Sequence, residues 1–249
     1  MPQITGAEGA DMNKILITND DGIDADGLLR LVKAAQKFGE VWVVAPDGQR
    51  SASSHCIAIH HTFEIWPYDY PLEGVTAFAC SGMPADCIRV GIHYLMKEKP
   101  LAVFAGINKG FNSATDIQYS GTCGAAFEGA FQECHSIAFS EGFQDDHSVT
   151  DRYLPEIMEK LMQMPLGYGE IHNVNFPTCP LSECKGILWD RTVSRGMFYR
   201  DGYRSLGEQE DGRTRITIDG MPCRECEEGS DMHALVNNYV SVGIVHNVG

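Results

Sequence analysis

The sequence predicts an α/β fold in which a doubly wound, mostly parallel sheet lies between two layers of helices. Short runs of apolar, β-branched residues alternate along the chain with longer stretches of helical periodicity, an alternation typical of such sheets. The chain has 249 residues, of which 43% are hydrophobic, and this suits one α/β domain with a full core. The predicted architecture is therefore a Rossmann-like, three-layer domain.

The first half of the chain predicts four strands and two helices. A buried strand at residues 15–18 precedes a helix at residues 25–38, whose apolar residues recur at helical spacing and which Gly39 ends. Pro84 is typical of the first position of a second helix. The other predicted strands of this half lie at residues 41–45, 62–66 and 76–80.

The second half continues the alternation as far as Pro177. A strand at residues 101–105 leads into a loop at residues 106–121, and a helix of small residues follows at residues 122–134. A further helix is predicted at residues 152–164, with Pro155 in its first turn, where a proline is tolerated. The remaining predicted strands of this part lie at residues 137–140 and 171–176.

From Pro180 onward the pattern loosens into short strands separated by polar, glycine-rich loops. We expect strands at residues 186–189, 214–218 and 239–245, in an extended, antiparallel β-rich appendage that spans about 180–249. Residues 1–11 predict a loose N-terminal extension, so residues 12–249 form a single domain with its appendage. No apolar run approaches the ~20 residues of a membrane span, and we expect no membrane partner.

Charge and cysteine usage restrict the partners and the compartment. Acidic residues outnumber basic ones by 34 to 19, which gives a formal charge of −15 and argues against a nucleic acid polymer as partner. Nine cysteines form no disulfide framework, so we expect reduced thiols in the cytoplasm. Cys223 and Cys226 form a C-x-x-C without a second pair, for which chance spacing is favoured over a zinc or redox site.

Polar side chains follow three of the predicted strands, where each strand ends. Asp20 and Asp21 follow the first strand, Ser51 follows the second, and Asn108 and Asn112 follow the strand at residues 101–105. In an open parallel sheet, ligands bind beyond these strand ends, and carboxylate, hydroxyl and amide oxygens suit a hard cation such as Mg²⁺ or Mn²⁺ rather than zinc. Taken alone, the two aspartates are equally well explained as an acidic turn that caps the next helix.

The stretch Ser120–Gly121–Thr122 stands directly before the small-residue helix. Free N–H groups at such a helix start form a seat for a phosphate group, and plain N-capping by Ser or Thr is the commoner use of the same residues. The first strand is not followed by G-x-G-x-x-G, and the chain has no G-x-S-x-G. A dinucleotide-binding loop and a serine hydrolase are thereby disfavoured.

Several motifs together resemble the SurE family of metal-dependent 5′/3′-nucleotidases, also called survival-protein phosphatases. The resemblance spans nearly the whole chain and continues weakly over residues 230–242. The motifs are ILITNDDG (15–22), VVAPDGQRS (43–51), GMPADC (82–87), AGINKGFN (105–112), YSGTCGAAFEG (119–129) and NVNFP (173–177). The sequence departs from the family's pattern at Met83, where Thr is usual, at Thr115, where an acidic residue is common, and after Val245, where members carry a further segment beyond the point at which this chain ends.

The resemblance implies a cytoplasmic phosphomonoesterase that hydrolyses nucleoside monophosphates with one divalent ion, Mg²⁺ or Mn²⁺, and that forms a homodimer or a dimer of dimers. By residue, it implies metal ligands at Asp20, Asp21, Ser51 and Asn108, phosphate contacts at Asn112, Ser120, Gly121 and Thr122, and catalytic roles for Asp20, Asp21 and Asn112. Two alternatives stay open. One is an exopolyphosphatase or broader phosphatase on the same site, and the other is a nucleotide-binding module without turnover.

Overall fold

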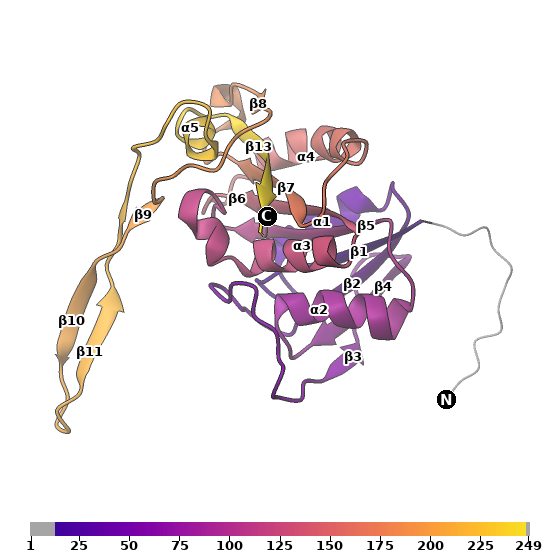
Figure 1. Cartoon of the computed structure of the whole chain (residues 1–249), viewed down its shortest axis with the longest axis horizontal. Coiled ribbons are helices and arrows are strands. Elements are labelled where there is room, and N and C mark those ends of the chain that lie inside the picture. The colour runs from indigo at the N-terminus through magenta and orange to yellow at the C-terminus, as the bar shows by residue number, and fades with distance from the viewer. Residues whose placement is uncertain (1–12, 248–249) are drawn as a thin grey trace, which may run out of the picture.

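A computed structural model describes residues 13–247 of the chain, and within them nine strands form one sheet (Figure 1). The predicted N-terminal extension at residues 1–11 lies outside the described residues. From one edge to the other the strands are β3 (Ile65–Pro67), β4 (Val75–Cys80), β2 (Glu40–Pro46), β1 (Lys14–Thr18), β5 (Ala102–Lys109), β6 (His135–Glu141), β7 (Glu170–Phe176), β13 (Val240–His246) and β8 (Ile187–Leu188).

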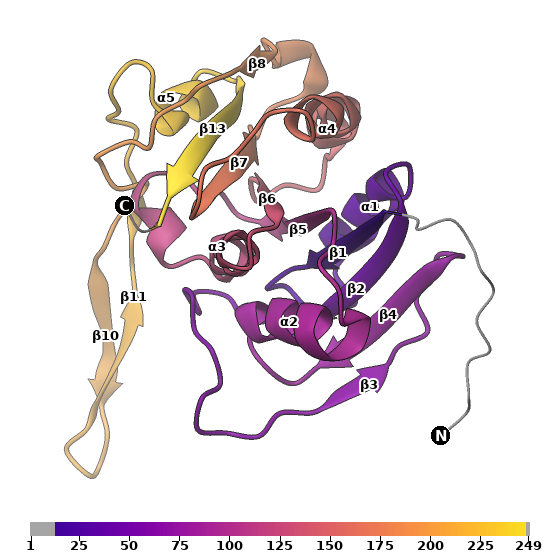
Figure 2. The same cartoon turned by 45° about the vertical axis from the view of Figure 1, so that its right-hand side comes forward.

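Helices cover both faces of this sheet (Figure 2). Helices α1 (Asp26–Ala35) and α4 (Ser148–Leu161) bury Leu28, Leu31 and Ile157 in the core of one face. Helices α2 (Pro84–Val90) and α3 (Gly121–Phe131) bury Ile88 and Ala126 in the core of the other. The remaining helical segments are η1 (Gly91–Met96), η2 (Ala114–Gln118), η3 (Leu181–Glu183) and α5 (Asp231–Val236).

Six neighbouring strands, from β4 to β7, run parallel, which confirms the doubly wound, mostly parallel fold. Strand β13 pairs antiparallel with β7, and β8 pairs parallel with β13. The strands expected at residues 186–189 and 239–245 therefore extend the main sheet instead of belonging to a separate appendage. Their short apolar runs mark them as strands but do not identify their neighbours.

The antiparallel part that does stand apart is a narrow ribbon that projects from the body in Figure 1. It consists of the hairpin β10 (Tyr203–Glu208) and β11 (Thr214–Ile218), and of the pair β9 (Tyr199–Arg200) and β12 (Met221–Pro222) at its base. None of the helices within residues 13–247 has the length and apolar character needed to cross a membrane.

Helix α4 begins at Ser148, four residues before the predicted start, so the expectation that Pro155 lies in the first turn was wrong. The carboxylate of Asp146 accepts a hydrogen bond from the Ser148 N–H (2.9 Å), which supports the earlier start. Pro155 lies in the helix interior, where its missing N–H leaves the carbonyl of Asp151 without a helical donor.

Strand β5 runs on to Lys109, into the stretch expected to be a loop. The pairing with β6 shifts register between Ala105 and Asn108, as in a β-bulge. Gly106 makes this possible, because it has a φ of +136° and a Cβ there would lie 2.3 Å from the carbonyl oxygen of Phe139. The bulge carries the strand forward so that Asn108 stands at the sheet's carboxyl edge.

Candidate active site

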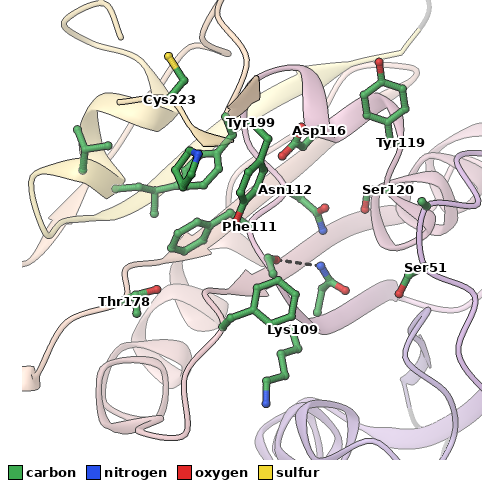
Figure 3. Close-up of a pocket in the computed structure, with 18 of the residues that line it drawn as sticks. Ser51, Lys109, Phe111, Asn112, Asp116, Tyr119, Ser120, Thr178, Tyr199 and Cys223 are labelled. Atoms are coloured by element: carbon green, nitrogen blue, oxygen red, sulfur yellow. Dashed lines mark hydrogen bonds between the residues drawn. The ribbon is translucent and has the colours of Figure 1, made fainter. Parts of the chain in front are cut away.

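A cleft of about 530 Å³ opens at the carboxyl ends of the parallel strands, where the sequence predicts the ligand site (Figure 3). Its lining includes five of the eight predicted site residues, namely Asp20, Ser51, Asn108, Asn112 and Ser120. The other three, Asp21, Gly121 and Thr122, are not part of the lining but contact or adjoin residues that are. The structure thus gathers side chains from three strand ends and one helix start around a single space.

Asp20, at the end of β1, is nearly enclosed, with an exposed fraction of 3%. The hydroxyl of Thr122 donates a 2.6 Å hydrogen bond to Oδ1 of Asp20, and the backbone carbonyl of Asp20 accepts from the N–H of Arg50. Burial is the main reason that the pKa of Asp20 is raised to about 6, and the neighbouring Asp21 raises it further against the lowering effect of the Thr122 bond. The Asp20 carboxylate is therefore fixed by hydrogen bonds, but burial makes its ionised form less stable than it is in water.

Asp21 is fixed from the side of β5, because the backbone N–H of Lys109 donates to its Oδ2 (3.0 Å). Burial raises its pKa, and bonds from Lys109 and the Gln49 side chain oppose that shift. Gln49 also donates to Oγ of Ser51 (3.0 Å), so it links two predicted metal ligands. Reasoning from the sequence assigned no role to Gln49.

Asn108 lines the cleft. Its Nδ2 donates to the carbonyl of Gly110 (2.9 Å), which leaves Oδ1 as the acceptor available to a ligand. Within residues 13–247 no group of three or more His, Cys, Asp or Glu side chains could hold a metal ion. The candidate cation site therefore rests on two carboxylates with neutral oxygens from Ser51 and Asn108, a donor set that suits Mg²⁺ or Mn²⁺ and not zinc. A bound cation would also offset the cost of burying Asp20 beside Asp21.

Asn112 is clamped by two asparagines of β7. Its N–H donates to Oδ1 of Asn175 (2.8 Å), and its carbonyl accepts from Nδ2 of Asn173 (2.8 Å) and Nδ2 of Asn175 (3.0 Å). Its own Nδ2 donates to Oγ of Ser140 (2.8 Å). We predicted no role for Ser140, Asn173 or Asn175 from the sequence. Two asparagines at alternate positions of a buried strand are nevertheless a signal, because buried amide groups need hydrogen-bond partners.

Ser120 caps helix α3, since its Oγ accepts from the N–H of Cys123 (3.0 Å). The helix start lies against Asp20, because a Cβ on Gly121 would approach Oγ of Ser53 to 2.6 Å and Cβ of Asp20 to 2.9 Å. The capping role of Ser120 is confirmed. The phosphate-binding role of this helix start stays a prediction, and the hydroxyl of Thr122 has Asp20 as its partner here.

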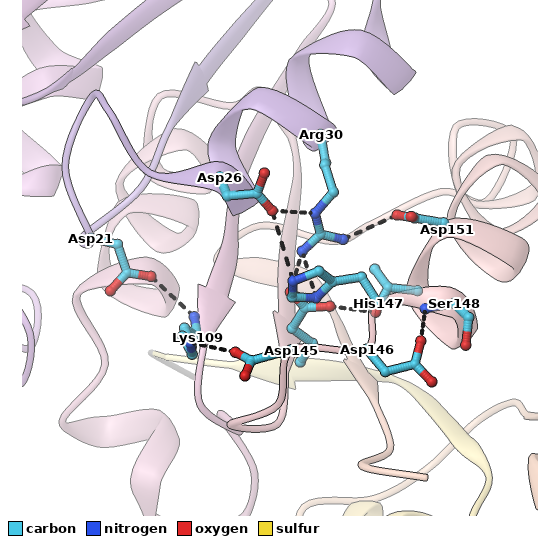
Figure 4. Close-up of polar contacts among 11 residues, drawn as sticks. Asp21, Asp26, Arg30, Lys109, Asp145, Asp146, His147, Ser148 and Asp151 are labelled. Carbon is cyan, nitrogen blue, oxygen red and sulfur yellow. Dashed lines mark hydrogen bonds and ion pairs between the residues drawn. The ribbon is translucent and has the colours of Figure 1, made fainter. Parts of the chain in front are cut away.

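A charged network supports the cleft from the side of α1 and α4 (Figure 4). Arg30 pairs with Asp26 (2.8 Å), with Asp151 (3.1 Å) and with the buried Glu141 at the end of β6. The backbone carbonyl of Glu141 accepts from the N–H of Gly110 (2.7 Å). This network therefore ties two helices to residues 108–112, the end of β5 and the turn after it, which carry Asn108 and Asn112.

All nine cysteines are free thiols. Cys223 lines the cleft, and Cys223 and Cys226 are both half-buried. Neither belongs to a group of three potential metal-binding side chains in the part of the chain that the structure describes. The C-x-x-C spacing thus gains no support as a zinc site.

Comparison with known proteins places the chain among close relatives over nearly its full length. The family model described as "Survival protein SurE" matches residues 15–198. The protein "5'-nucleotidase SurE" of Clostridium botulinum (strain ATCC 19397 / Type A) is 34% identical over 236 residues, which cover 93% of this chain and 92% of that protein. The protein of the same name from Alkaliphilus metalliredigens (strain QYMF) is 35% identical over 239 residues, covering 94% and 92%. The crystal structure of the SurE protein from Aquifex aeolicus aligns with a TM-score of 0.78 at 30% identity, covering 94% of this chain and 93% of that one.

Proposed function

This chain belongs to the SurE family, and we propose that it is a divalent-metal-dependent phosphomonoesterase that hydrolyses nucleoside 5′-monophosphates to nucleoside and phosphate. Relatives at about a third identity carry the name 5′-nucleotidase. The observation that carries the proposal is the meeting of oxygen side chains from three strand ends with the start of helix α3 in one cleft. Such an arrangement can hold a hard cation and a phosphate group side by side.

Asp20, Asp21, Ser51 and Asn108 would hold one divalent ion, Mg²⁺ or Mn²⁺. When bound, the ion supplies charge that polarises the phosphoryl group and lowers the pKa of a water molecule. The protein's own part is to keep the two carboxylates close together despite their repulsion. Thr122 does this for Asp20 and the N–H of Lys109 does it for Asp21, each by a hydrogen bond to one carboxylate oxygen.

The phosphoryl group would lie between Asn112 and the start of helix α3. The bond to Asn175 fixes the backbone of Asn112, and the bond to Ser140 fixes its side chain. A donor that is already in position before the reaction is what stabilisation of charge on the phosphoryl oxygens requires. Backbone N–H groups and the dipole at Ser120 and Gly121 favour the same negative charge. The oxygen of the attacking water would form the new bond to phosphorus and give its proton to a carboxylate oxygen of the Asp20–Asp21 pair. The bond between phosphorus and the 5′ oxygen of the ribose then breaks, that oxygen takes the proton, and phosphate and nucleoside leave.

A phosphate-release assay on AMP, 3′-AMP and inorganic polyphosphate tests the proposal. We expect release from AMP with Mg²⁺ or Mn²⁺ present, and loss of nearly all of it in Asp20→Asn. Asp145→Asn is the matched control, because Asp145 is a fully exposed aspartate beside Lys109 and its loss should leave the rate unchanged. Faster release from polyphosphate than from AMP would favour the exopolyphosphatase alternative, and wild-type rates in Asp20→Asn would refute the site.

The family resemblance also leads us to propose a cytoplasmic enzyme that forms a homodimer or a dimer of dimers. The nine free thiols agree with a reducing compartment. Light scattering coupled to size-exclusion chromatography tests the assembly, and a monomer at micromolar concentration would contradict it.

A further inference from the structure

The turn that follows β2 lies directly against the turn that follows β1. The N–H of Arg50 donates a 2.6 Å hydrogen bond to the backbone carbonyl of Asp20. A Cβ on Gly22 would lie 3.1 Å from Cα of Gly48, so the two backbones meet there with no side chain between them. This close approach brings the side chain of Gln49 within reach of residues from both strand ends.

Gln49 uses one amide group for two neighbours. Its Nε2 donates to Oγ of Ser51 (3.0 Å), and its side chain also forms a hydrogen bond with Asp21. An ionised carboxylate only accepts hydrogen bonds, so the donor to Asp21 is the amide nitrogen, which carries two hydrogens. A single side chain therefore contacts two of the four predicted metal ligands, one from each of two strand ends.

The hydroxyl of Ser51 has no other support. Ser51 is exposed, and among residues 13–247 Gln49 is the only hydrogen-bond partner of its hydroxyl. The two aspartates are held differently, by the hydroxyl of Thr122 and by the backbone N–H of Lys109. A serine side chain that is free to turn among its rotamers loses that freedom when it binds a cation. Gln49 fixes the side chain beforehand.

The amide of Gln49 suits this position because it is neutral and lies outside the cleft lining. A lysine in its place would repel a bound cation, and a carboxylate would add to the repulsion between the two aspartates. Glutamine supplies two N–H donors without either effect. Since its side chain does not line the cleft, it acts on the site through Ser51 and Asp21.

We infer that Gln49 is a positioning residue of the candidate metal site, whose amide holds Ser51 and Asp21 in the arrangement that would receive a divalent ion. The inference rests on the proposed function, because it is the proposed ion that gives these two side chains a common task. Removing a partner that orients metal ligands typically lowers metal affinity about ten- to a hundred-fold. Because Gln49 is exposed, we expect the lower end of that range.

The test measures Mn²⁺ binding directly, through the electron paramagnetic resonance signal of the free ion as the EDTA-treated, dialysed protein is titrated. Gln49→Met keeps the length of the side chain, removes the donor, and should raise the Kd for Mn²⁺ about tenfold. In the Ser51→Ala background the same change should raise it about threefold or less, because the contact through Ser51 is already lost. Urea unfolding in EDTA should give Gln49→Met the wild-type midpoint, since this side chain is exposed.

Gln36→Met is the matched control. Gln36 is also an exposed glutamine, its Nε2 donates one hydrogen bond (2.9 Å) to the carbonyl of Glu73, and it does not line the cleft. It should leave the Kd for Mn²⁺ unchanged. An unchanged Kd in Gln49→Met, or an equal tenfold rise in the Ser51→Ala background, overturns the inference while the metal site stands.

Other outcomes separate this inference from the proposed function. Absence of Mn²⁺ binding in the wild type, or equal binding in Asp20→Asn, overturns the proposed metal site and the inference with it. If the Kd values follow the expected pattern but AMP is not hydrolysed, the positioning role of Gln49 stands and the proposed reaction fails.

Discussion

Replacing Asp20 by Asn should make the metal-free protein more stable while it removes activity. Burial raises the pKa of Asp20 from 3.8 to about 6, so the folded state holds a proton at this site more strongly than the unfolded state does. A shift of about two pKa units corresponds to roughly 3 kcal/mol of unfavourable free energy when the group is charged at neutral pH. Asparagine is neutral, nearly the same shape, and can still accept the hydrogen bond from Thr122.

The sign of the pH dependence follows from the raised pKa. The folded state binds more protons than the unfolded state between about pH 4 and pH 6, so the contribution of Asp20 to stability is full below this window and is lost as the pH rises through it. Urea unfolding in EDTA, followed by circular dichroism, measures the difference between variant and wild type. We expect Asp20→Asn to be more stable by about 2 to 3 kcal/mol at pH 7.5 and by only about 1 kcal/mol at pH 4.5.

Two controls decide what the difference means. Asp145→Asn changes a fully exposed carboxylate and should leave stability unchanged at both pH values. Addition of Mn²⁺ should stabilise the wild type and not Asp20→Asn, because only the wild type has both carboxylates. A variant that is equally or less stable than the wild type at pH 7.5 without metal would refute the reasoning that Asp20 is held at a cost.

Three further predictions concern the supports of the site and the opposite end of the sheet. Asn175→Ala removes two hydrogen bonds to the backbone of Asn112 and should lower the unfolding free energy by about 1 to 3 kcal/mol. It should also lower kcat/KM for AMP at least tenfold, and an unchanged kcat/KM would show that activity does not need these bonds. Ser120→Ala removes the cap of α3 and should cost about 1 kcal/mol, which thermal unfolding measures, and equal stability would contradict the capping role. Burial lowers the pKa of both His135 and His172, so both side chains are neutral in the folded protein and protonating them as the pH falls below 6.5 costs stability. His172→Gln removes one of these groups and should flatten the decline in unfolding free energy between pH 6.5 and 5. An unaltered slope would refute the assignment.

The position of the site could be predicted from sequence because it depends only on the direction of the strands. Carboxyl ends of parallel strands meet at one edge, so Asp20, Ser51 and Asn108 had to lie near one another once their strands were recognised. The clamp on Asn112 depends on long-range pairing instead. Asn175 lies 63 residues away from Asn112, and nothing in the local pattern of either segment specifies the contact.

Some features of the fold could not be predicted because they depend on which element a segment packs against, and not on the segment's own hydrophobic pattern. Strand β13 has the apolar run of a strand, but its antiparallel place beside β7 is set by packing. Tyr199 belongs to a two-residue strand, which is too short to give a periodic signal. The start of α4 was missed because Pro155 was assumed to need the first turn, whereas the packing of Leu154 and Ile157 in the core outweighs the missing hydrogen bond.

The most direct test of metal-dependent nucleotide hydrolysis is a titration of the EDTA-treated, dialysed protein with Mn²⁺ while phosphate release from AMP is followed. We expect no release without the ion, a rate that rises and saturates as Mn²⁺ is added, and no response in Asp20→Asn at the same concentrations. Release from AMP at the full rate in EDTA, or an equal response to Mn²⁺ in Asp20→Asn, would contradict it.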